Sequence, residues 1–128
     1  MPIKVLVVED DYHAQQMISA GLGRLQEVQA ILAGTIDEAR MLLQIHPDTF
    51  IIAIDGCVPG DELNTLPLIR EIVKSGFKGE LIAISSDPWY RDEMRLAGCR
   101  HECKKSWLSK LVADLLQRIR TASPPPVA

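Results

Sequence analysis

Acidic residues stand where two short apolar runs end. Glu9 and Asp10 follow the run Ile3–Val8, whose β-branched residues are typical of a strand covered on both faces. Asp55 follows a second run of this kind, Phe50–Ile54. Because open α/β sheets bind ligands where their parallel strands end, we expect these carboxylates to converge at one edge. Converging carboxylates are tolerated mainly around a divalent cation, so the sequence predicts a hard metal ion beside a carboxylate nucleophile.

The composition indicates one folded domain with a single core. The chain has 128 residues, of which 47% are hydrophobic and 24% are charged. A formal net charge of -3 argues against nucleic-acid contact, because neutralising phosphates needs a clustered basic excess. No apolar stretch approaches the roughly 20 residues that span a bilayer, and no signal-peptide pattern is present, so we expect no membrane contact and a cytoplasmic location. Cys57, Cys99 and Cys103 lack zinc-site spacing and are expected to be free thiols.

Strand and helix patterns alternate five times along the chain. The expected strands are Ile3–Val8, Val28–Ala33, Phe50–Ile54, Leu81–Ile84 and Cys99–Cys103. The expected helices are Tyr12–Leu25, a helix from Thr35 to before Pro47, Leu66–Ser75, a helix from Pro88 to about Gly98, and a last helix along the stripe Trp107–Ile119. With right-handed crossovers, this order predicts an α/β fold, a (βα)5 doubly wound parallel five-stranded sheet.

Three side chains are predicted to cap helices that follow strands. Asp11 is expected to cap the first helix, and Asp87 the helix that begins with Pro88. Thr35 and Glu38 have the spacing of a capping box, in which the hydroxyl accepts from the Glu38 N–H and the carboxylate reaches back. These caps predict helix starts close to the ends of the preceding strands.

The end of the chain differs from the rest in composition. Three consecutive prolines, Pro124–Pro126, cannot continue a helix and favour an extended segment. We therefore predict that residues 1–121 form the domain. Residues 122–128 are predicted to be a proline-rich tail or the start of a linker.

From Ile3 to about Arg120, the sequence resembles the receiver domain of two-component response regulators. The residues that carry the resemblance are Glu9-Asp10 after the first strand, Asp55 with Pro59 four residues on, Ser85-Ser86 ending the fourth strand, and Lys105 after the fifth. Each motif is weak alone, but their order and their places at the element ends make the combination specific. The resemblance implies the flavodoxin-like receiver architecture.

The resemblance also implies a phosphorelay function. Asp55 would accept a phosphoryl group from a histidine kinase or a histidine phosphotransfer protein. Mg²⁺ would be held by Glu9, Asp10, Asp55 and the backbone carbonyl of Cys57. The chain would be a signalling domain and not an enzyme, with at most slow self-phosphorylation from small phosphodonors and autodephosphorylation.

Two further residues are implied to bind the phosphoryl group. Lys105 would supply a positive charge to its oxygens, and the Ser85 hydroxyl a hydrogen bond. Lys104 is an alternative to its neighbour, although counting seven residues from Gly98, as the family does, selects Lys105. The alternative interpretation of Ser85 is that it is only a small residue at the end of a strand.

Phosphorylation is implied to change the face formed by the fourth helix, the fifth strand and the fifth helix. That face would bind a downstream protein target, an output domain or a second copy of the chain, giving a homodimer. A haloacid-dehalogenase type of phosphotransferase is disfavoured, because it needs a second acid two residues after the nucleophile and Cys57 stands there.

Three departures from the family pattern leave a second function open. Ser106 replaces the proline that normally follows the lysine, so the usual cis bond is not expected there. Glu102 stands where many receivers carry an aromatic residue that reports phosphorylation, and the segment Asp61–Thr65 is longer than is typical. The alternative is a degenerate receiver that acts as a phosphorylation-independent interaction module.

Overall fold

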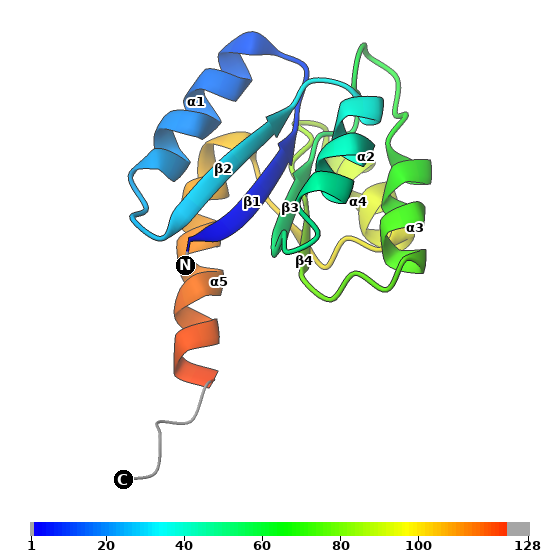
Figure 1. Cartoon of the computed structure of the whole chain (residues 1–128). Coiled ribbons are helices and arrows are strands. Elements are labelled where there is room, and N and C mark those ends of the chain that lie inside the picture. The colour runs from blue at the N-terminus through cyan, green and yellow to red at the C-terminus, as the bar shows by residue number, and fades with distance from the viewer. Residues whose placement is uncertain (1, 123–128) are drawn as a thin grey trace, which may run out of the picture.

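The computed structural model describes residues 2–122, which form a parallel sheet with helices on both faces (Figure 1). The strands are β1 (Ile3–Val8), β2 (Val28–Ala33), β3 (Ile51–Ile54), β4 (Glu80–Ala83) and β5 (His101–Glu102). The helices are α1 (Tyr12–Gly23), α2 (Ile36–Ile45), α3 (Leu66–Lys74), α4 (Pro88–Ala97) and α5 (Leu108–Ala122), with the short 3-10 helix η1 (Lys105–Trp107) before α5. The strand order is β2-β1-β3-β4-β5 and all pairs are parallel, which confirms the predicted doubly wound fold.

Some element ends differ from the sequence prediction. α1 ends at Gly23, so Leu25 lies in the turn after it. β5 is reduced from the expected Cys99–Cys103 to two residues, because only His101 and Glu102 take part in its ladder with β4. The predicted proline-rich segment lies outside the described residues from position 123 onward, while Ala122 belongs to the last turn of α5.

The strands divide the core into two layers. Val5 and Val7 of β1 pack with α1 and α5 on one face of the sheet, and Leu6 and Val8 pack with α2, α3 and α4 on the other. All four are at most 1% exposed. Burial on both faces is why Val5–Val8 of β1 are all apolar, and why the first acidic residues stand where the strand leaves the core.

Side-chain caps fix where three helices begin. Asp11 accepts a hydrogen bond from an N–H in the first turn of α1 at 2.8 Å, and Asp87 does the same for α4 at 2.9 Å. Thr35 Oγ1 accepts from the Glu38 N–H at 3.0 Å. The Glu38 carboxylate reaches back to Gly34 at 2.9 Å, one residue before the position that a capping box uses. Three of the loops that follow the strands are therefore held by short local contacts.

The connection between α3 and β4 has no room for a side chain at Gly79. A methyl group there would collide with the Phe50 carbonyl oxygen and lie 2.6 Å from the Phe77 ring. We expect Gly79→Ala to lower the free energy of unfolding by about 2 kcal/mol, because backbone atoms must move apart. Gly23→Ala is the control, since no atom lies within 4 Å of its methyl group. Urea denaturation compares the two variants, and equal stabilities would contradict the expectation.

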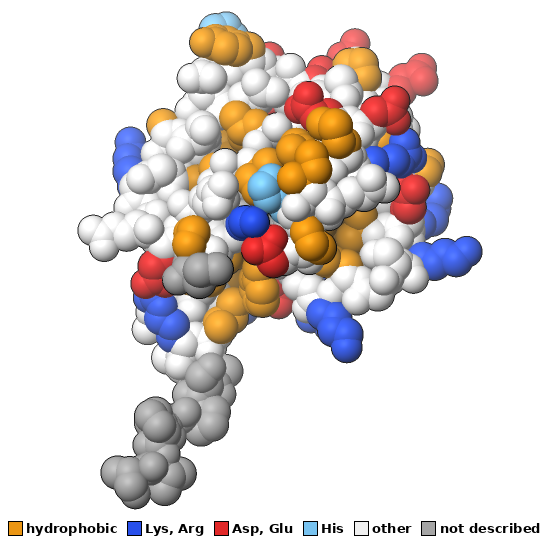
Figure 2. Space-filling model, viewed as in Figure 1, with side chains coloured by type: hydrophobic (Ala, Val, Ile, Leu, Met, Phe, Trp, Pro, Cys, Tyr) orange, Lys and Arg blue, Asp and Glu red, His pale blue; other side chains and the backbone are white. Residues whose placement is uncertain are grey.

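Charged and apolar side chains are mixed on the surface, and several acidic groups gather at the upper right of the view in Figure 2. The arrows of β1 and β2 point toward this side of the view in Figure 1. Within residues 2–122, no helix is long and apolar enough to cross a membrane. The three cysteines are free thiols.

Candidate functional site

Three acidic side chains meet at the carboxyl edge of the sheet. Glu9 and Asp10 follow β1, Asp55 follows β3, and these two strands are paired neighbours. One carboxylate oxygen of each residue lies within 4.8 Å of the other two. The structure thus brings together the carboxylates that the sequence predicts to converge.

Hydrogen bonds fix the backbone of Glu9 and Asp55. The N–H groups of Glu9 and Asp55 continue the sheet ladder, each donating at 2.9 Å to the last residue of a neighbouring strand. The Gln15 side chain donates to the Glu9 carbonyl at 2.6 Å, and the buried Thr65 hydroxyl donates to the Asp55 carbonyl at 2.9 Å. The acidic side chains therefore start from fixed backbone positions.

Lys105 pairs with two of the three carboxylates. Its Nζ lies 2.7 Å from Glu9 Oε1 and 3.5 Å from Asp55 Oδ2. Burial by itself lowers the pKa of Lys105, but the bonds to Glu9 and Asp55 outweigh burial and raise it. Lys105 therefore stays charged. One ammonium group therefore stands among three acidic side chains, and it pairs with two of them.

Glu9 is the most deeply buried member of the cluster, with no exposed surface, and Asp55 is buried as well. Among the described residues, its Oε2 is the one buried side-chain oxygen or nitrogen without a hydrogen-bond partner. Burial, followed by the neighbouring Asp55, raises the pKa of Glu9 to about 8, against the opposing effect of Lys105. An unpaired buried carboxylate oxygen is costly unless a proton or a cation completes it.

A cavity of about 490 Å³ opens beside the carboxylates. Its lining includes all six residues that the resemblance implies for the site: Glu9, Asp10, Asp55, Cys57, Ser85 and Lys105. The Ser85 hydroxyl is buried and accepts from the Asp87 N–H at 3.2 Å. Lys104 is exposed and does not line the cavity.

The loop between β3 and α3 forms one wall of this cavity and holds its own shape. Val58-Pro59 is a cis peptide bond, the only one within residues 2–122, so the bond after Lys105 is trans. The Asn64 amide bonds both the N–H and the C=O of Val58, at 2.8 and 3.0 Å. The sequence analysis missed Asn64, although an asparagine in a glycine- and proline-rich loop is a known signal of such turns.

Tyr90 and Arg91, both in the first turn of α4, are further residues that the sequence analysis missed. The Tyr90 hydroxyl donates to the carbonyl of Asp61 at 3.2 Å, which ties α4 to the cavity wall. Arg91 Nη1 donates to the Ser85 carbonyl at 2.8 Å, and its Nε bonds Glu102 at 3.3 Å. Their place in the helix could be predicted from the Asp87-Pro88 start, but their partners could not, because these lie in other elements.

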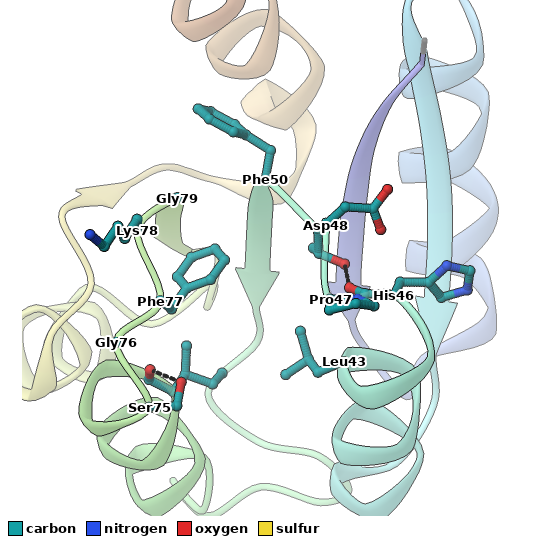
Figure 3. A pocket seen from close by; sticks show the side chains of 12 residues that line it. Leu43, His46, Pro47, Asp48, Phe50, Ser75, Gly76, Phe77, Lys78 and Gly79 are labelled. Carbon is teal, nitrogen blue, oxygen red and sulfur yellow. Dashed lines mark hydrogen bonds between the residues drawn. The ribbon is translucent and has the colours of Figure 1, made fainter.

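A second cavity, of about 530 Å³, lies at the opposite edge of the sheet, beyond the ends of α2 and α3 (Figure 3). Leu43 and Phe77 face one another across it. The carboxylate of Asp48 at its rim is already paired with Lys4 at 2.9 Å. Among the described residues, three metal-binding side chains meet only at Glu9, Asp10 and Asp55, so the acidic cavity is the candidate site.

No protein-family model and no curated protein matches the sequence, but solved structures match the fold. A response regulator receiver protein from Pseudoalteromonas atlantica has a TM-score of 0.75 and 22% identity, over 94% of this chain and 99% of that one. A response regulator from Thermotoga maritima gives 0.73 and 19%, over 91% and 99%. The response regulatory domain of protein mrkE from Klebsiella pneumoniae gives 0.71 and 20%, over 94% and 97%. The chain therefore has the fold of response regulator receiver domains.

Proposed function

We propose that this chain works as a receiver domain in which Asp55 accepts a phosphoryl group from a histidine kinase or a histidine phosphotransfer protein. The observation that carries the proposal is the cluster of Glu9, Asp10 and Asp55 around one lysine at the carboxyl edge of the sheet. Open α/β sheets bind ligands at this edge. The receiver fold of the solved relatives supports the same assignment.

The donor set suits Mg²⁺. This ion takes oxygen ligands and keeps several waters, so the carboxylates of Glu9, Asp10 and Asp55 with the Cys57 carbonyl would suffice. The unpartnered Oε2 of the buried Glu9 is an oxygen that a cation would complete. When bound, the ion screens the approach of an anionic phosphorus and neutralises charge that spreads over the transferred oxygens.

Asp55 is oriented for nucleophilic attack. Its Oδ1 accepts from the Gly56 N–H at 2.8 Å, and its Oδ2 lies 3.5 Å from Lys105. A carboxylate oxygen forms a bond to phosphorus while the bond from phosphorus to the donor imidazole nitrogen breaks, which gives an aspartyl phosphate. Lys105 and the Ser85 hydroxyl then donate hydrogen bonds to the phosphoryl oxygens.

The proposed output is a change of the face formed by α4, β5 and α5. Binding there of a downstream target, an output domain or a second copy would carry the signal onward. The function is then signalling, and turnover is limited to slow self-phosphorylation and autodephosphorylation. A phosphorylation-independent interaction module is the second candidate, favoured by the ion-paired Glu102 at the position where many receivers carry an aromatic residue.

Incubation with acetyl phosphate and Mg²⁺ tests the proposal. We expect the intact mass to rise by one phosphoryl group, and the rise to be absent when a chelator removes the metal. Trp89 is exposed and lies between the cavity-lining residues Asp87 and Tyr90, so its fluorescence is a second readout of changes at the start of α4. A mass that stays unchanged at every magnesium concentration would favour the interaction module.

A further inference from the structure

Arg91 connects the carboxyl end of β4 with the edge strand β5. From α4, its Nη1 donates to the Ser85 carbonyl at 2.8 Å and its Nε to Glu102 Oε1 at 3.3 Å. The Arg91 side chain is only 12% exposed, so these contacts are largely shielded from water. One guanidinium group thus joins a residue of the acidic cavity to a residue of β5.

Each partner of Arg91 is needed to keep its charge buried. A guanidinium group taken out of water requires hydrogen-bond acceptors and an opposite charge, and here it finds one carbonyl and one carboxylate. Charge-assisted bonds of this kind are strong and directional. If either acceptor moves, the planar guanidinium group must turn with it or lose a bond, and both outcomes disturb the other contact.

β5 is a short strand whose position can change when the Arg91 guanidinium group moves. It has two residues, and its ladder with β4 holds only the pairs Ile82–His101 and Ala83–Glu102. Backbone bonds from the N–H groups of Arg100 and Cys103 to β4 flank these pairs, and the ion pairs of the Glu102 side chain add to this anchoring. Glu102 is therefore placed to report the position of Arg91.

We propose that Arg91 is a positioning residue that transmits displacement of Ser85 to Glu102, and so couples the state of the acidic cavity to β5. The inference rests on the proposed function, because a phosphoryl group on Asp55 is what would draw Ser85 inward. The Ser85 hydroxyl, now bonded to the Asp87 N–H, would bond the phosphoryl group instead, and an inward shift of the Ser85 backbone would carry its carbonyl away from Arg91.

Arg95 offers a matched control on the same helix. It also pairs with Glu102, at 3.4 Å, but its side chain is 53% exposed, and within residues 2–122 Glu102 is its one ion-pair partner. Arg95→Ala thus removes the same charge from α4 and the same kind of ion pair, while leaving the bond between Arg91 and Ser85 in place.

Hydrogen exchange read by mass spectrometry tests the coupling. Wild type, Arg91→Ala and Arg95→Ala are each measured with Mg²⁺, with and without acetyl phosphate. They are compared at equal occupancy of Asp55, which the intact mass reports. In wild type and Arg95→Ala, we expect phosphorylation to change exchange in the peptide that contains β5. In Arg91→Ala, we expect that difference to be lost, a result that a merely structural role would not give.

The outcomes separate the coupling from the proposed function. A β5 response that persists in Arg91→Ala at full occupancy overturns the coupling and leaves the phosphoacceptor role standing. Absence of phosphoryl uptake in wild type overturns both. Should Arg91→Ala fail to fold by circular dichroism, Glu102→Leu decides, because it has a similar volume and removes the oxygen that accepts from Arg91. Loss of the response in that variant supports the coupling, and its retention refutes it.

Discussion

Asp55→Asn is expected to take up no phosphoryl group from acetyl phosphate, whatever the magnesium concentration. An amide is a far weaker nucleophile than a carboxylate, and the substitution also removes one of the three acidic groups that would hold the ion. Asn fits the same space, and its Oδ1 can still accept from the Gly56 N–H. The expected loss is therefore chemical and not structural. Intact mass measured over time is the readout.

Asp61→Asn is the matched control for this experiment. Asp61 lines the same cavity and the substitution is identical, but its carboxylate is not part of the acidic cluster. We expect this variant to take up phosphate as wild type does. Uptake by Asp55→Asn at a comparable rate would show that the acceptor lies elsewhere, and peptide mapping of the modified protein would then locate it.

The strand ends could be predicted because their physical cause is local. Val5–Val8 of β1 and all of β3 are buried on both faces, so these segments consist of apolar residues, and the first acid marks the place where each strand leaves the core. Helix starts at Asp11 and Asp87 were predictable for the same reason, since a cap is a contact within three residues. Together these local signals placed Glu9, Asp10 and Asp55 at one edge of the sheet.

The end of α1 and the extent of β5 depend on contacts between residues that are far apart in the sequence. Leu25 belongs to the apolar stripe of α1 and still packs into the core, but from the turn after the helix. β5 is polar and short, and its two ladder pairs are fixed by β4. A periodic pattern reports which side chains face the core, and it does not report whether the backbone that carries them is helical.

The contacts between side chains of the site could not be predicted from the sequence for a similar reason. Lys105 and Glu9 are separated by 96 positions and meet at 2.7 Å. Only the resemblance to receivers pointed to that lysine and away from its neighbour Lys104. The bonds of Arg91 to Ser85 and Glu102 had no such guide, because they depend on how α4 lies against β4 and β5.

Magnesium affinity is expected to rise steeply with pH, because Glu9 must lose a proton before it can bind the ion. Burial and the neighbouring Asp55 raise the pKa of Glu9 from 4.5 to about 8, so the metal-free protein holds this proton at neutral pH. Below that pKa, the proton competes with the metal, and the affinity should change about tenfold for each pH unit. Isothermal titration calorimetry in buffers of different ionisation enthalpy measures both the affinity and the proton released.

The raised pKa of Glu9 also determines how the free energy of unfolding of the metal-free protein changes with pH. An unfolded chain loses the Glu9 proton near 4.5, whereas the folded protein keeps it until about 8. Between these values the folded state binds more protons, so the free energy of unfolding falls as pH rises and levels off above the folded pKa. Added Mg²⁺ should offset the loss, and most strongly at the alkaline end, where it meets no competing proton.

Glu9→Gln separates this explanation from a general effect of pH on the acidic cluster. The amide keeps an oxygen for Lys105 and cannot titrate, so magnesium affinity should fall and lose most of its pH dependence. The metal-free variant should also lose the decline in stability between 4.5 and 8. If Glu9→Gln kept the full slope of affinity against pH, the titrating group would be another carboxylate. The buried, unpartnered oxygen of Glu9 would then not be what draws the ion to this edge of the sheet.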